Sequence, residues 1–156
     1  MTEIQIDYLD MLKIDTLKPE YLVGLKELYE ESFEGSVTDL GLMKQTYNLI
    51  KGNSNYIILC ALTDGKVVGS VMGVVCYELF GECLPFMVVE NVAVLEAYRG
   101  KGIARELMTN LEKYALDNKC TTILLVSSAH RTGAHKLYES LGYGNDKVNG
   151  YRKRLA

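Results

Sequence analysis

The sequence predicts an α/β chain, with a mostly antiparallel sheet that contains one parallel strand pair and is flanked by helices. Strand-like segments 55–63 and 66–77 flank the dipeptide Asp64–Gly65, which is typical of tight hairpins, so these two strands pair antiparallel. A strand, a helix and a second strand then follow closely over residues 86–127, an order that implies a right-handed crossover between parallel neighbours. At 156 residues, the chain has the length of a single domain, 1–156, with one sizeable core.

The N-terminal third predicts a strand and two helices. Residues Ile4–Lys13 alternate loosely, as in a strand, and Thr16 with Pro19 signals the start of the first helix. The apolar face of this helix carries Leu22, Leu25, Leu28, Tyr29 and Phe33, and its other face carries Glu20, Glu27, Glu30, Glu31 and Glu34. These glutamates either attract a cationic acceptor or form an ordinary solvated face.

A second helix is predicted over 39–51, with four apolar side chains directed inward: Leu40, Met43, Tyr47 and Ile50. The later segments comprise an apolar strand at Phe86–Leu95, an amphipathic helix from Ile103 to about Asn118, a buried strand at Thr121–Ser127 and a last helix at Thr132–Leu141. The dipeptide Asn149–Gly150 then predicts a turn between segments 143–148 and 151–155.

Composition and charge exclude several classes of protein. The formal charge is −3 with dispersed basic residues, which argues against nucleic acid as a partner. No apolar run approaches transmembrane length, so we expect a cytoplasmic protein that does not bind membranes. The two histidines, His130 and His135, lie five residues apart and on different helix faces, so no metal site is expected. The cysteines, mostly within apolar strand patterns, are interpreted as reduced core thiols: Cys60, Cys76, Cys83 and Cys120.

A basic, glycine-containing segment links the strand that ends near Leu95 to the helix that begins at Ile103. Gly100 and Gly102 have no Cβ and adopt positive φ readily, so a ligand can approach the main chain there. The start of a helix leaves unpaired N–H groups and carries the positive end of the helix dipole, which favours phosphate groups. Positive charge is added by Arg99, Lys101 and Arg105. The segment therefore predicts a phosphate-binding turn.

The spacing of this turn excludes two common phosphate-binding motifs. The dinucleotide motif G-x-G-x-x-G requires a third glycine where Arg105 stands, and no Walker motif occurs in the chain. The motif that is present is R-x-x-G-x-A, from Arg99 to Ala104, after the strand V-E-N-V-A-V. A second block, A-H-K-L-Y-E-S-L-G-Y, spans Ala134–Tyr143. In these two blocks the chain resembles the GNAT superfamily of acyl-CoA-dependent N-acyltransferases. One departure is Arg131, where family members often carry asparagine.

The resemblance implies a GNAT-type fold and a set of residues for acetyl-CoA, the co-substrate. It places the pantetheine arm of coenzyme A along the main chain of Val92, Ala93 and Val94. It places the pyrophosphate at the glycine turn and the helix start that follows it: Arg99, Gly100, Lys101, Gly102, Ile103, Ala104 and Arg105. It also places the amine acceptor against the two N-terminal helices, and it makes a homodimer possible.

Two side chains are candidates for proton transfer. Glu90 interrupts an apolar strand, where burial would penalise the charged carboxylate and suit it to the role of general base. A bulge of the kind common in the family would re-aim this side chain. The alternative is that Glu90 pairs with a buried cation or binds substrate. Tyr138 is the candidate acid, because a phenol with a reference pKa of about 10 can protonate a thiolate. Alternatively, Tyr138 is a core residue.

The sequence therefore predicts an acetyl-CoA-dependent N-acetyltransferase that acts on a primary amine of a small molecule or a protein, by direct attack in a ternary complex. A non-catalytic acyl-CoA sensor is the alternative. Nothing in the sequence identifies the amine.

Overall fold

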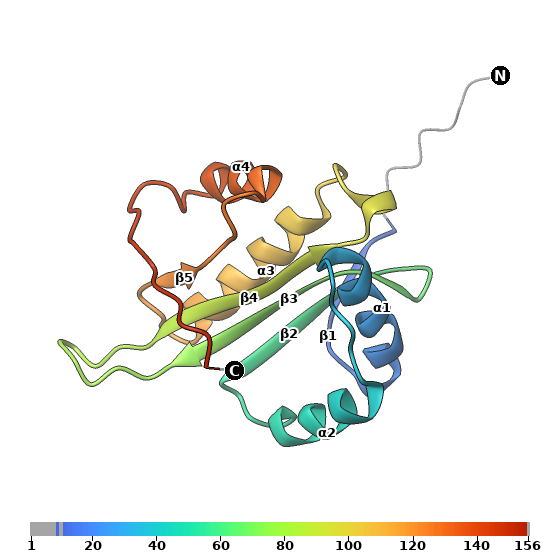
Figure 1. The fold of residues 1–156 in the computed structure, drawn as a ribbon. Coiled ribbons are helices and arrows are strands. Elements are labelled where there is room, and N and C mark those ends of the chain that lie inside the picture. The colour runs from blue at the N-terminus through green and yellow to red at the C-terminus, as the bar shows by residue number, and fades with distance from the viewer. Residues whose placement is uncertain (1–8, 10, 156) are drawn as a thin grey trace. The chain divides into compact units, whose positions relative to one another are not determined.

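The computed structural model describes residues 9 and 11–155, which fall into two compact units that meet at Leu124–Leu125. The first unit contains the first three helices and almost all of the sheet (Figure 1). The second contains the last helix and the chain that follows it.

A five-stranded sheet with the order β1-β2-β3-β4-β5 forms the centre of the first unit. The first three pairings are antiparallel, whereas β5 runs parallel to β4. This arrangement confirms the predicted mixed sheet. The strands are β1 (Lys13–Thr16), β2 (Tyr56–Thr63), β3 (Lys66–Cys76), β4 (Phe86–Val94) and β5 (Ile123–Leu125).

The turn between β2 and β3 has the geometry that its sequence predicts. Asp64 and Gly65 have φ angles of 49° and 76°, the left-handed conformations that a two-residue hairpin loop needs. The strands pair from Thr63–Lys66 at the turn to Tyr56–Val74 at the far end. The predicted hairpin is therefore confirmed.

Helices cover both faces of this sheet (Figure 1). The helix α3 (Ile103–Asp117) packs on one face, where a Cβ added at Gly73 would lie 2.8 Å from the Leu111 side chain. The opposite face receives α1 (Leu22–Ser32), which follows a short 3₁₀ turn at Pro19–Tyr21 and approaches Val67 through Gly24. The core lies between these layers and includes Leu28, Val68, Met87, Leu107 and Leu111, all essentially inaccessible to solvent.

The second helix, α2 (Leu40–Ile50), begins where the sequence predicts, because the Asp39 side chain caps it by accepting a hydrogen bond from the Leu42 N–H at 2.8 Å. The four side chains predicted to face inward are only half-buried, and no residue of α2 is fully buried. Leu42 and Leu49 are exposed. This helix therefore lies at the periphery of the first unit.

Two sequence-based expectations about strands differ from the structure. The first described strand is Lys13–Thr16, whereas the sequence predicts Ile4–Lys13; residues 9, 11 and 12 are not in a strand, and residues 4–8 and 10 lie outside the described part of the chain. The register of β1 is set by its pairing with residues 59–62 of β2, which local alternation does not reveal. The strand β5 is only three residues long and is not buried.

The predicted hairpin around Asn149–Gly150 is also absent, since the described residues after α4 contain no strand. The reason lies in burial: Val148, Tyr151 and Leu155 are at least 71% exposed. An isolated two-stranded hairpin without a packed face is marginally stable in water.

The second unit contains α4 (Thr132–Ser140), which agrees with the predicted last helix. Within the described chain, no helix is long and apolar enough to cross a lipid bilayer. All four cysteines are free thiols, but only Cys60 is buried. Cys83 is exposed because it lies in the loop between β3 and β4 rather than in a strand, so its interpretation as a core thiol is wrong.

Candidate active site

The glycine turn, residues 99–102, has the backbone that the sequence predicts. Gly100 and Gly102 have φ angles of 73° and 82°. Gly102 is the N-cap of α3 and provides no side chain to bond the first N–H groups of that helix. Among the described residues, only the Leu9 methyl groups, at 3.8 Å, lie within 4 Å of a Cβ placed at Gly102. The main chain at the start of α3 is therefore open to a ligand, and the helix dipole favours an anion there.

Two of the basic side chains of this turn donate to backbone carbonyls of the residues that precede it. The Arg99 Nε donates to the Val94 carbonyl at 3.0 Å, and the Lys101 Nζ donates to the Ala97 carbonyl at 3.1 Å. The Lys101 ammonium also lies 5.2 Å from the centre of the Tyr98 ring. These contacts fix the turn against the end of β4 while they keep positive charge near it. Arg105 is exposed on the first turn of α3.

A bulge interrupts β4 just before the segment predicted to bind the pantetheine arm. Glu90 pairs with Met72 of β3, but the next pair is Ala93 with Ser70, so Asn91 and Val92 lie opposite the single residue Val71. Asn91 has a φ of 53°, in the left-handed region that asparagine tolerates better than most residues. The bulge that the family resemblance implied is therefore present.

Glu90 itself is exposed, so the expectation that it lies in apolar surroundings is wrong. In the sequence it stands between apolar residues, but those neighbours alternate onto the face that α3 covers, for example Val89 opposite Gly73. Glu90 points to the other face. Any catalytic role of this carboxylate depends on its position beside the bulge rather than on desolvation.

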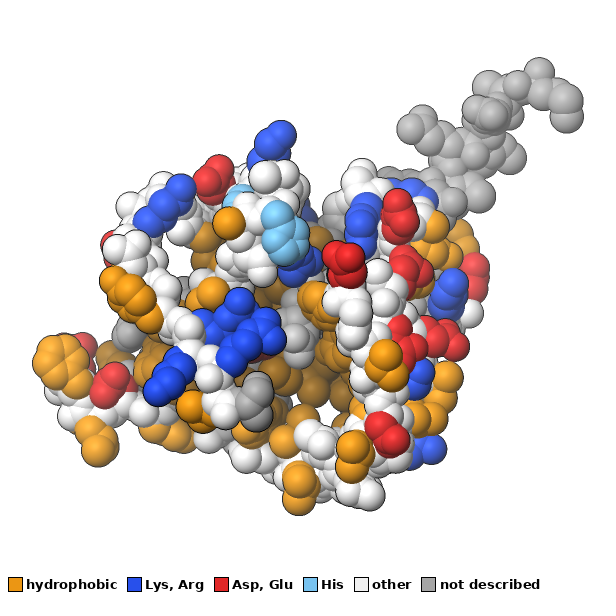
Figure 2. Space-filling model, in the orientation of Figure 1, with side chains coloured by type: hydrophobic (Ala, Val, Ile, Leu, Met, Phe, Trp, Pro, Cys, Tyr) orange, Lys and Arg blue, Asp and Glu red, His pale blue; other side chains and the backbone are white. Residues whose placement is uncertain are grey.

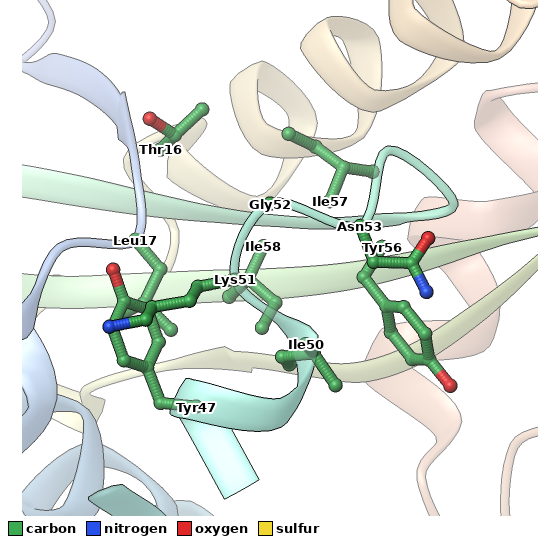
Figure 3. A pocket seen from close by; sticks show the side chains of 10 residues that line it. All are labelled: Thr16, Leu17, Tyr47, Ile50, Lys51, Gly52, Asn53, Tyr56, Ile57 and Ile58. Carbon is green, nitrogen blue, oxygen red and sulfur yellow. The ribbon is translucent and has the colours of Figure 1, made fainter.

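The row of paired residues that contains Glu90 extends across the sheet toward α2. Glu90 pairs with Met72, and Met72 pairs with Ile58 of β2. Directly paired residues point to the same face, so the Ile58 side chain lies about 10 Å from Glu90 on that face, two strand spacings away. Ile58 also lines a pocket of about 200 Å³ between β2 and the end of α2, with Tyr47 and Lys51 among its walls (Figure 3).

The glutamate-rich face of α1 is partly committed to structural bonds. Figure 2 shows acidic side chains gathered over this helix. Among them, Glu30 forms an ion pair with Lys26 at 2.8 Å and accepts from the Thr38 N–H at 2.9 Å. Glu31 accepts a hydrogen bond from the Glu96 N–H at 2.7 Å, just beyond β4. These two carboxylates therefore stabilise the chain around α1, whereas Glu27 and Glu34 remain exposed.

Tyr138 belongs to the second unit, and its phenol is buried at 6% exposure. Its ring meets the Tyr143 ring edge-on, with centres 6.2 Å apart. Burial raises the pKa of Tyr138, and the positive charge of Arg131 opposes that rise. The phenol therefore holds its proton at neutral pH, although proton transfer to a thiolate becomes more unfavourable.

Arg131, the departure from the family pattern, is the N-cap of α4, and its N–H donates to the Ser128 carbonyl at 3.0 Å.

The sequence did not single out Tyr29, which lies on α1. Burial raises the pKa of Tyr29 to about 12, and the side chains of Ser70 and Asn91 oppose that rise. The sequence signal was a hydroxyl-bearing residue on an otherwise apolar helix face.

Among the described residues, no group of three His, Cys, Asp or Glu side chains is arranged to hold a metal.

Comparison with known proteins identifies the sequence family. Residues 22–143 match the acetyltransferase (GNAT) family. The chain is 30% identical over 138 residues to the N-acetylaspartate synthetase of Xenopus tropicalis. The matched region is 85% of this chain and 48% of that protein. It is 27% identical over 148 residues to the glucosamine 6-phosphate N-acetyltransferase of Candida albicans, covering 95% of this chain and 87% of that protein. The chain spans about half the length of the N-acetylaspartate synthetases that it matches.

Solved structures share the fold. A putative acetyltransferase from Agrobacterium tumefaciens superposes with a TM-score of 0.83 at 24% identity, over 91% of this chain and 99% of that one. The glucosamine-6-phosphate N-acetyltransferase of Arabidopsis thaliana superposes with a TM-score of 0.75 at 19% identity, over 93% of this chain and 99% of that one. At these identities the likeness concerns the fold alone.

Proposed function

Because the chain belongs to the acetyltransferase (GNAT) family, we propose that it transfers an acetyl group from acetyl-CoA to a primary amine, by direct attack in a ternary complex. The observation that carries this proposal is the succession of three features along one continuous segment. Glu90, an exposed carboxylate of β4, directly precedes the bulge, and the chain then leads into a glycine turn at the start of α3. An acyl acceptor site and an anion site thus lie at the two ends of Val92–Val94.

In this proposal the start of α3 binds the pyrophosphate of coenzyme A through the N–H groups of the turn and the first helical residues. Positive φ at Gly100 and Gly102 keeps that main chain accessible. The pantetheine arm then lies along residues 92–94 as an additional strand, with the thioester near the bulge, where regular pairing between β3 and β4 is interrupted. Arg99, Lys101, Ile103, Ala104 and Arg105 complete the site.

Glu90 is proposed to take a proton from the acceptor amine, directly or through one water molecule. Its exposure is compatible with this role, because an ammonium ion must reach the carboxylate from solvent. Tyr138 is proposed as the acid that protonates the departing thiolate. The raised pKa of Tyr138 keeps the phenol protonated, as a proton donor requires.

The acceptor is proposed to lie on the sheet face that carries Glu90, Met72 and Ile58, and to extend toward the pocket beside α2. The half-buried apolar side chains of this row would contact the carbon skeleton of the acceptor, and Lys51 stands at its far end. Similar proteins are named for acceptors as different as aspartate, glucosamine 6-phosphate and aminoglycosides, so the acceptor class is left to experiment.

A panel of amines tests this function. The purified chain is incubated with acetyl-CoA and each amine, including amino acids, amino sugars, polyamines and peptides with free N-termini, and free thiol is measured. We expect thiol release only with a subset of amines. Tight acetyl-CoA binding with no amine-dependent release across the panel would instead support a sensor.

A further inference from the structure

Glu31 lies in the last turn of α1 and bonds to a part of the chain that is 65 residues away in the sequence. Its Oε1 atom accepts a hydrogen bond from the Glu96 N–H at 2.7 Å. Glu96 is the first residue of a short 3₁₀ turn, Glu96–Tyr98, which connects the end of β4 to the glycine turn. One side chain thus joins α1 to the segment that leads into the proposed coenzyme A site.

The Glu96 N–H needs a partner from outside its own 3₁₀ turn. The first N–H groups of a helix have no intrahelical acceptor, and the residue before the helix commonly caps one of them with a side-chain oxygen. Leu95 holds that position, and its side chain forms no such cap. Glu31 therefore supplies from α1 the acceptor that the local sequence lacks.

The position of Glu31 is not explained by the stability of α1. A negative charge in the last turn of a helix lies near the negative end of the helix dipole, which disfavours it. The hydrogen bond from Glu96, in contrast, is charge-assisted and is therefore stronger than a bond between two neutral groups. The stabilisation that Glu31 provides thus falls on the segment after β4.

The 3₁₀ turn is bonded directly to the glycine turn. The Glu96 carbonyl accepts a hydrogen bond from the Arg99 N–H at 3.2 Å. The next carbonyl, that of Ala97, accepts from the Lys101 Nζ at 3.1 Å. Because both of these basic residues are bonded to the segment that Glu31 holds, a shift of that segment would move them relative to the start of α3.

We propose that Glu31 is a positioning residue, which holds the 3₁₀ turn through the Glu96 N–H and thereby keeps the glycine turn in the conformation that binds coenzyme A. For its effect on binding, this inference rests on the proposed function. Glu31 acts through its hydrogen bond and not through its charge, because a carboxylate near the site would by itself repel phosphate groups.

The test compares Glu31→Ala, which removes the acceptor, with Glu31→Gln, which keeps a side-chain oxygen that can accept from the Glu96 N–H. In calorimetric titrations with coenzyme A, the dissociation constant should rise about fivefold in Glu31→Ala, the factor that one exposed hydrogen bond carries, and less than about twofold in Glu31→Gln. The matched control is Glu27→Ala, which removes the same charge from an exposed site one turn earlier on α1 and should leave this affinity unchanged.

The sign of the effect separates the hydrogen bond from the charge. If the charge of Glu31 were what mattered, removing it would strengthen the binding of an anion, and Glu31→Ala and Glu31→Gln would behave alike. Coenzyme A affinity in Glu31→Ala equal to or higher than that of the unaltered chain would overturn the proposal. A loss in Glu31→Gln as large as that in Glu31→Ala would also overturn it.

A second pair of variants removes the donor instead of the acceptor. Proline is tolerated at the first position of a helix, and Leu95 has a ψ of 138°, within the range that a residue before proline adopts. Glu96→Pro lacks the N–H, so the further change Glu31→Ala should alter its affinity for coenzyme A by less than about 1.5-fold. A fivefold effect of Glu31→Ala in the Glu96→Pro chain would mean that Glu31 acts through another contact, and would contradict the proposal.

Hydrogen exchange and kinetics distinguish the positioning role from the proposed function. Exchange of the Glu96 and Arg99 amides should be faster in Glu31→Ala and unchanged in Glu27→Ala. The KM for acetyl-CoA should rise about fivefold in Glu31→Ala, whereas kcat at saturating acetyl-CoA should stay the same, because the bound coenzyme then holds the turn. A chain that acetylates no amine but shows the changes in exchange and affinity would refute the proposed transfer and leave the positioning role standing. Unchanged exchange at Glu96 would refute the positioning role.

Discussion

Replacing Gly102 by glutamate tests the anion site at the start of α3, and the structure separates its steric, conformational and electrostatic effects. The space around the new side chain is adequate, since in the described part of the chain only the Leu9 methyl groups lie near its Cβ, at 3.8 Å. The φ of 82° costs an L-residue about 1–2 kcal/mol. The fold should tolerate this cost, so Gly102→Glu is expected to remain folded.

The electrostatic effect is larger. A carboxylate about 5 Å from the two charges of a pyrophosphate, at an effective dielectric constant of about 40, opposes binding by about 3 kcal/mol, or about 10²-fold in affinity. Gly102→Ala is the matched control, because it has the same backbone cost without the charge. Calorimetric titration with coenzyme A should therefore show Gly102→Glu binding about 10²-fold more weakly than Gly102→Ala.

Salt provides a second check, since the Debye length falls to about 3 Å in 1 M salt and the difference between the two variants should shrink there. If Gly102→Glu is folded and binds coenzyme A as tightly as Gly102→Ala, the phosphate does not lie at the start of α3 and the reasoning is wrong.

Three further predictions follow from the site and the core. Glu90→Gln should lower turnover mainly at low pH, where most of the amine is protonated, and turnover should partly recover at high pH. A loss that is equal at all pH values, or that the exposed control Glu82→Gln shares, would indicate that Glu90 has a binding or structural role instead. Tyr138→Phe should lower the amine-dependent rate by roughly 10²-fold with little change in acetyl-CoA affinity, and less with an acyl donor whose thiol is more acidic. Turnover equal to that of the unaltered chain would remove Tyr138 from the mechanism. Burial raises the pKa of Cys60 to about 12, so above about pH 9 the thiol loses its proton in the unfolded chain but keeps it in the folded chain. The stability that the neutral thiol contributes below about pH 9 is therefore lost as the pH rises toward 12. Cys60→Ala should show a smaller decline over that range in denaturant titrations followed by circular dichroism, and an equal decline would contradict this assignment.

The parts of the fold that the sequence predicted correctly depend on local chemistry. Asp64–Gly65 determines a two-residue turn wherever strands flank it, and Gly100 and Gly102 adopt positive φ at the start of a helix because no other residue does so as cheaply. The periodicity of residues 103–117 required only one apolar face, which α3 buries against the sheet.

The errors arise where distant residues decide the outcome. The exposure of Glu90 was not predicted, because a sheet has two faces and the sequence does not say which side chains of a strand point toward α3. Asn149–Gly150 has the same turn chemistry as Asp64–Gly65 but lacks flanking residues that become buried. Tyr29 looked like any member of an apolar face, because the polar side chains that affect the pKa of its phenol, Ser70 and Asn91, lie far away in the sequence.

Direct attack in a ternary complex is tested most simply by a single-turnover experiment with the chain in excess over acetyl-CoA. Released thiol and acetylated amine are quantified together, and intact mass spectrometry follows the protein. We expect one acetylated amine for each thiol released, no release before the amine is added, and no acetylated protein at any time. Thiol released without amine, or an acetyl group found on the protein before it appears on the amine, would contradict the proposed mechanism.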